Sequence, residues 1–77
     1  MSSRAPRITG PEAIRALQRA GWYIARQSGS HVILHHDELP GGRVTVPNHA
    51  RITLHPKTLS SILDQARLSV QEFQSLL

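Results

Sequence analysis

The segment Arg26-Gln27-Ser28-Gly29-Ser30-His31, followed by Val32-Ile33-Leu34, decides how this chain folds. Strand-forming residues lie on both sides of Gly29, and glycine adopts the positive φ that a tight reversal requires. The segment therefore predicts a β-hairpin with His31 at the first position of its second strand. There the imidazole meets solvent and can exchange a proton near neutral pH. An ordinary turn beside an ordinary strand-edge histidine has the same short pattern, so both readings stay open.

The composition predicts one small folded domain over residues 1–77, with residues 1–8 as a flexible leader. Hydrophobic residues make up 39% of the chain and charged residues 18%, which is typical of a folded domain. Cysteine is absent, which excludes disulfides and thiolate metal sites. No apolar stretch reaches membrane-spanning length and no signal-peptide core is present, which predicts a cytoplasmic protein.

Positive charge dominates the chain, with nine basic residues against five acidic ones and a net charge of +4. All the basic residues except Lys57 are arginines, whose planar guanidinium pairs with phosphate and stacks on bases. This balance favours a nucleic acid or an acidic protein as partner. Many small basic domains nevertheless bind nothing specific.

Helix signals stand on both sides of a strand-rich region. Thr9 and Glu12 form a capping box before an apolar stripe that ends at Gly21, which predicts a helix of roughly ten residues. A second helix is predicted from His55 onward, and Ser69 caps a short final one. Between the first two helices, strands are expected at 22–26, 30–36 and 43–46, the last stopped by proline. Short connections favour an antiparallel meander, and hence an α+β fold with helices on one sheet face.

Four segments in this order resemble the HicA family of toxins, the mRNA interferases of bacterial toxin–antitoxin pairs. They are Ala-Gly-Trp-Tyr at 20–23, Gly-Ser-His at 29–31, Arg-Val-Thr-Val-Pro at 43–47 and Lys-Thr-Leu-Ser-Ser-Ile-Leu at 57–63. The resemblance covers about residues 9–69. It implies a fold like a double-stranded-RNA-binding domain and toxicity through RNA cleavage. It also implies a catalytic role for the histidine of Gly-Ser-His, which is His31 in this chain. It also implies a monomer that joins a HicB-like antitoxin in a hetero-oligomer.

Two positions depart from the family pattern. Ser28 replaces the lysine or arginine that usually precedes Gly-Ser-His, which removes one phosphate contact. Arg67 replaces the glycine that usually ends the second helix, so this helix is free to run on into the last segment.

Metal-free RNA cleavage requires a base, an acid and cations around the phosphate, and histidine suits the first two roles. His31 is the candidate base. The two-residue period of a strand places His35 on the same face, as a candidate acid or phosphate contact. A solvated surface histidine is the favoured alternative for this residue. Ser30 can contact a phosphate or the backbone. Arg26 and Arg43 can flank the phosphate or remain solvated strand-end charges.

The other chemistries that the residues suggest are weaker. His31, His35, His49 and Asp37 offer metal donors, but no compact pair at helical spacing exists, so neither metal nor cofactor is expected. Of the adjacent pair Trp22 and Tyr23, either ring can stack bases, while at least one is expected in the core.

The sequence thus predicts a small ribonuclease toxin that acts on mRNA and is held inactive by its antitoxin. A non-catalytic RNA-binding module of the same fold is the alternative. A protein whose positive surface meets only an acidic partner is a third reading.

Overall fold

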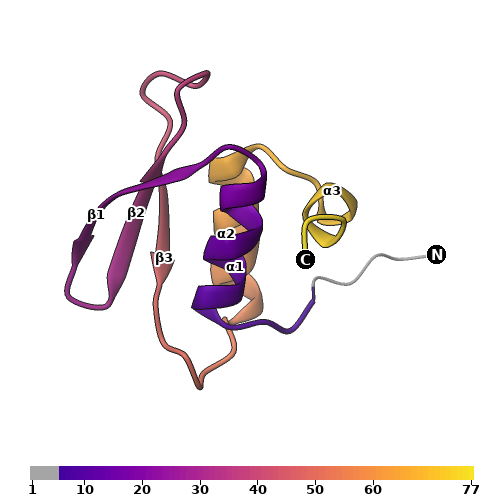
Figure 1. Cartoon of the computed structure of the whole chain (residues 1–77). Helices are drawn as coiled ribbons and strands as arrows, with labels where there is room; N and C mark the ends of the chain where they lie inside the picture. The colour runs from indigo at the N-terminus through magenta and orange to yellow at the C-terminus, as the bar shows by residue number, and fades with distance from the viewer. Residues whose placement is uncertain (1–5) are drawn as a thin grey trace.

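The computed structural model describes residues 6–77 and has the predicted α+β architecture, like that of a double-stranded-RNA-binding domain (Figure 1). Helix α1 precedes three strands, and helices α2 and α3 follow them. The elements are α1 (Gly10–Arg19), β1 (Tyr23–Ser28), β2 (His31–His35), β3 (Val44–Pro47), α2 (Pro56–Ala66) and α3 (Val70–Gln74).

The three strands form one antiparallel sheet in the order β1-β2-β3, as the short connections predict. Helices α1 and α2 lie on one side of this sheet, and both pack against β3 (Figure 1). The opposite face, here called the outer face, is not covered by a helix. Strand β1 lies farthest from the helices, and all of its residues are exposed.

The hydrophobic core lies between the helices and the inner face of the sheet. Val32 and Leu34 of β2 and Phe73 of α3 are fully covered there. Trp22 is buried while Tyr23 is exposed, so the adjacent aromatic pair is divided between core and surface as expected. The remaining buried hydrophobic residues are Ile8, Ala13, Ile14, Ala16, Leu17, Val44, Val46, Leu59, Ile62, Leu63 and Ala66.

The helix starts follow the sequence signals. The Thr9 backbone N–H donates to Glu12 Oε1 at 3.0 Å, and the Glu12 N–H donates back to Thr9 Oγ1 at 3.4 Å. The Thr9 hydroxyl also donates to Glu12 Oε1, at 3.0 Å. The two bonds from the Thr9 N–H and hydroxyl to the carboxylate, with a smaller contribution from the Arg15 charge, lower the pKa of Glu12 against a small opposing effect of desolvation. Ser69 and Glu72 repeat this capping box before α3, with the same effect on the pKa of Glu72.

The first helix is docked onto the sheet through Gly10, where a Cβ atom would overlap the carbonyl oxygen of Pro47. Just before it, Ile8 is buried and its carbonyl accepts the Leu54 N–H at 2.7 Å. Part of the predicted leader, residues 1–5, lies outside the described residues. Ile8 belongs to the folded domain, because its side chain completes the core.

The strand boundaries differ from the predicted ones by one or two residues. Pro47 does not stop the third strand but is its last residue, opposite His31. Proline is tolerated there because β3 is an edge strand, where a missing N–H breaks no ladder bond.

The second helix ends at Ala66 and does not continue into the last segment. Arg67 follows it in the left-handed conformation, with φ 59°, and its backbone N–H donates to the carbonyl oxygens of Asp64 and Leu63. Arginine thus adopts the left-handed conformation that glycine most often provides after the end of a helix. Within the described residues, every helix is too short or too polar to cross a lipid bilayer.

His36 connects α1 to the loop between β2 and β3. Its Nδ1 accepts the Glu38 N–H at 3.1 Å, so the proton of the neutral ring is on Nε2, which lies 3.0 Å from the Ala20 carbonyl oxygen. The ring also meets Trp22 edge-on, with centroids 5.2 Å apart. Both nitrogens are therefore engaged in holding the fold.

Replacing His36 with alanine should lower the free energy of unfolding by about 2 kcal/mol, since two hydrogen bonds of about 1 kcal/mol each are lost. Chemical denaturation measures this change. His35→Ala is the matched control: the neighbouring ring makes no hydrogen bond to any of residues 6–77, so its removal should cost less than about 0.5 kcal/mol. Equal losses in the two variants would contradict the structural role of His36.

Candidate nucleic-acid interface

The five histidines of the chain divide into two groups by their hydrogen bonds. His36 is engaged as described, and His55 Nδ1 accepts the Lys57 N–H at 3.1 Å to cap α2. The imidazole rings of the other three, His31, His35 and His49, make no hydrogen bond within the described residues. Two of these, His31 and His35, lie on the outer face of β2, where they are available to a ligand.

The turn before His31 is held from both sides. Gly29 has φ 59° while Ser30 does not adopt a positive φ, which is the requirement of a type II′ hairpin turn. Gln27 Nε2 donates to the Gly29 carbonyl at 3.1 Å, and the Asn48 N–H donates to the Ser30 carbonyl at 2.6 Å. His31 is thus exposed at a backbone position that the turn and β3 both define.

A β-bulge in β1 determines which side chains join His31 on the outer face. Tyr23 pairs with His35 and Ile24 with Leu34, but the next pair is Arg26 with Ile33. Ala25 is therefore the extra residue. In a regular strand Tyr23 and Arg26 would lie on opposite faces, whereas the bulge puts both on the outer face.

The register arranges the outer-face side chains in three rows across the sheet. His31 lies four residues from His35, so their Cα atoms are about 13 Å apart at about 3.3 Å per residue. The two histidines share a face, as predicted, but stand at opposite ends of β2. The rows are Tyr23–His35, Arg26–Ile33–Thr45 and Ser28–His31–Pro47.

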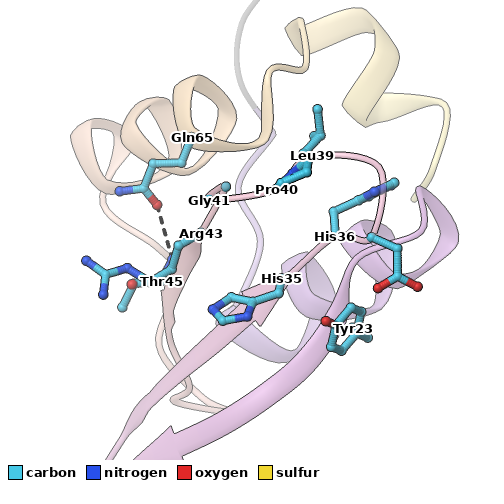
Figure 2. A pocket seen from close by; sticks show the side chains of 11 residues that line it. Tyr23, His35, His36, Leu39, Pro40, Gly41, Arg43, Thr45 and Gln65 are labelled. Atoms are coloured by element: carbon cyan, nitrogen blue, oxygen red, sulfur yellow. Dashed lines mark hydrogen bonds between the residues drawn. The ribbon is translucent and has the colours of Figure 1, made fainter.

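Two adjoining hollows lie at the His35 end of the sheet. The smaller, of about 340 Å³, is lined by Arg26, His35 and Arg43 together with Ala25 and Ile33. It brings three of the predicted contact residues together, while His31 and Ser30 lie outside it. Arg43 and His35 also line a larger hollow of about 710 Å³ beneath the 36–43 loop (Figure 2).

The outer face carries two arginines. Neither Arg26 nor Arg43 pairs with a carboxylate within the described residues. Arg19, on the helical side, differs because its Nη1 donates to the Leu76 carbonyl at 2.6 Å. Asp37, in the wall of the larger hollow, is the acidic exception. Nowhere in residues 6–77 do three His, Asp or Glu side chains gather as metal ligands would.

The sequence of the chain matches a model of a known protein family. The model of the family described as HicA toxin of bacterial toxin–antitoxin matches residues 10–68 of the 77-residue chain. The chain belongs to the HicA toxin family. No curated protein matches it. The match runs from the first residue of α1 to just beyond α2, and so includes the whole sheet and both departures from the HicA pattern, Ser28 and Arg67.

Sequence reasoning missed two features of this HicA surface. The bulge at Ala25 has no sequence signal, because alanine carries no turn preference. The role of Gln65 was also missed: its Oε1 accepts the Thr45 N–H at 3.1 Å and closes the free edge of β3 (Figure 2). A polar residue on the flank of an amphipathic helix does not predict such a partner.

Replacing Arg26 or Arg43 with alanine should make RNA binding less sensitive to salt. Each phosphate contact on a single strand contributes about −0.7 to the slope of log affinity against log salt concentration, so each variant should lose about that amount. Filter binding over a range of salt concentrations measures the slope. Arg15→Ala on the exposed side of α1 is the control. If it changes the slope as much as the two outer-face variants do, the RNA does not bind specifically at the outer face.

Proposed function

We propose that this HicA-family toxin is an endoribonuclease that binds mRNA across the outer face of its sheet and cleaves it with His31. The observation that carries the proposal is the exposed His31 imidazole, which makes no hydrogen bond within the part of the chain that the structure describes. It follows a turn held by two hydrogen bonds, on the face of the sheet without a helix. A histidine without a structural partner is available to exchange protons with a substrate.

In the proposed reaction, neutral His31 accepts the proton of a ribose 2′-hydroxyl. The 2′-oxygen then attacks the adjacent phosphorus, and the bond from phosphorus to the 5′-oxygen breaks. The leaving oxygen takes a proton from a general acid. Because His35 lies about 13 Å along β2, it serves a neighbouring nucleotide in this proposal and is not the acid for the same phosphate.

The remaining contact residues bind and orient the RNA. Ser30 adjoins the catalytic histidine, and its hydroxyl has no hydrogen-bond partner within the described residues, so it can donate to a phosphate oxygen. Arg26 and Arg43 supply the cations at the other end of β2. With Ser28 replacing a basic residue, these arginines carry more of the electrostatic attraction than they would otherwise.

Replacing His31 with alanine should abolish growth arrest on induced expression and RNA cleavage by the purified protein. The thermal midpoint should stay within a few degrees of the wild-type value, because the side chain is exposed and supports no other group. His49→Ala is the matched control, since His49 is exposed outside the strands.

Three outcomes would contradict the assignment: an unfolded His31→Ala variant, full toxicity of that variant, or equal loss in His49→Ala. Wild-type protein that binds RNA without cutting it would support the non-catalytic RNA-binding module instead.

The neutralising partner is proposed to be a HicB-like antitoxin that covers the outer face. Toxin–antitoxin pairs require a second chain, and a basic face without carboxylate partners fits one that presents acidic side chains. Association of such a pair is accelerated by electrostatic steering, which salt weakens.

Co-expression with the neighbouring reading frame should restore growth and yield a complex on gel filtration. In that complex, amides of β1 and β2 should gain protection from hydrogen exchange, because the partner covers them. The surface of α1 is the internal control. Protection confined to the helices would mean that the antitoxin acts without covering His31.

A further inference from the structure

The larger hollow at the end of the sheet has the dimensions of a ligand site. Its volume of about 710 Å³ lies within the range of about 300–1,000 Å³ that is typical of small-molecule pockets. One wall is the outer face near His35, and the other is the 36–43 loop (Figure 2). Arg43 lies where this hollow adjoins the smaller one, which also holds Arg26.

Tyr23 provides the hollow with an aromatic surface. It is the only exposed ring of the three Phe, Trp and Tyr residues in the chain, since Trp22 and Phe73 are buried and Tyr23 is 45% exposed. Its ring meets the His35 ring nearly perpendicularly, with centroids 6.3 Å apart and an interplanar angle of 78°. Figure 2 shows the two side chains next to one another in the wall of the hollow.

The polar groups around the rings include donors and an acceptor. Gln65 Oε1 is held by the Thr45 N–H, which leaves the Nε2 hydrogens to donate elsewhere. The Arg43 guanidinium has no carboxylate partner within the described residues. The Asp37 carboxylate lies in the same lining, and an ionised carboxylate is an acceptor of hydrogen bonds. A nucleobase edge presents both donors and acceptors, and its face stacks on aromatic rings.

We propose that this hollow is a subsite for one unpaired nucleotide of single-stranded RNA. The base stacks against Tyr23, beside His35, and the phosphate pairs with Arg43. The inference rests on the proposed function for the identity of the ligand as RNA, but it does not depend on cleavage. The nucleotide is unpaired because a base within a duplex has no free face to stack on a side chain.

Affinity for a ten-nucleotide single-stranded RNA, measured in the His31→Ala background, tests the proposal. Tyr23→Ala should weaken binding about tenfold, in line with a stacking contribution of about 1–3 kcal/mol per base. Tyr23→Phe should bind within about twofold, because it keeps the ring. Ile24→Ala is the matched control, since Ile24 is similarly exposed on the opposite face of β1 and should have no effect. The duplex form of the same RNA should not distinguish Tyr23→Ala from its parent.

A second measurement does not require a substitution at Tyr23. Uridine and adenosine monophosphates should shift the backbone amide resonances of Tyr23, His35 and Gly41 in the same background. Ribose 5-phosphate should shift them less, because it lacks the base. Equal responses to the nucleotides and the sugar phosphate, or an unchanged affinity of Tyr23→Ala, would overturn the subsite.

The outcomes separate this inference from the proposed function. If RNA binding depends on Tyr23 but the wild-type protein cleaves no RNA, the subsite is supported and the proposed ribonuclease activity is wrong. If the wild-type protein cleaves RNA but binding does not depend on Tyr23, the ribonuclease activity is supported and the subsite is wrong. If Tyr23→Ala weakens only the complex with the antitoxin, the hollow is a protein contact and the subsite is wrong.

Discussion

The pairing of β2 between its two neighbours is the constraint on which the rest of the structure depends. Its alternation puts Val32 and Leu34 under the helices, where they are 1% and 0% exposed, and turns His31 and His35 to the other side. A slip of one residue would exchange these sets, burying imidazoles and exposing the core. The same hydrophobic burial that stabilises the domain therefore orients the candidate catalytic histidine.

The edge strand β1 combines exposure with a local irregularity. No helix covers its inner face, so Ile24 remains 48% exposed and β1 is held mainly by its ladder with β2. The bulge at Ala25 interrupts that ladder, which makes a flat edge less available for pairing with other chains. It also brings Arg26 to the His35 side, so the same irregularity protects the edge and assembles the basic hollow.

The histidines illustrate how similar residues acquire different roles in a small domain. His36 and His55 satisfy backbone groups at places where the chain changes direction, and alternative side chains there would leave these groups unpaired. His31 and His35 satisfy none. The proposed ribonuclease function would use this contrast, because RNA cleavage requires groups that are free to exchange protons with the substrate.

The sequence by itself determined the local features of the protein. The capping residues Thr9 and Ser69, the reversal at Gly29 and the two faces of β2 depend on interactions within a few residues, and each was predictable. The α+β order followed from these signals, and the resemblance carried the assignment to HicA. The position of His31 at the start of the second hairpin strand was likewise predictable from the turn before it.

Only the tertiary structure decided which side chains meet. The direction of Arg26 depends on the register between β1 and β2, and the left-handed conformation of Arg67 on how α2 ends against the core. His36 acquired its role from Ala20, sixteen residues away. These features arise from contacts between segments that are distant in the sequence. A pattern of neighbouring residues therefore does not predict them. For the same reason the hollow beside Tyr23, formed by the sheet, the 36–43 loop and α2, could be found only in the folded chain.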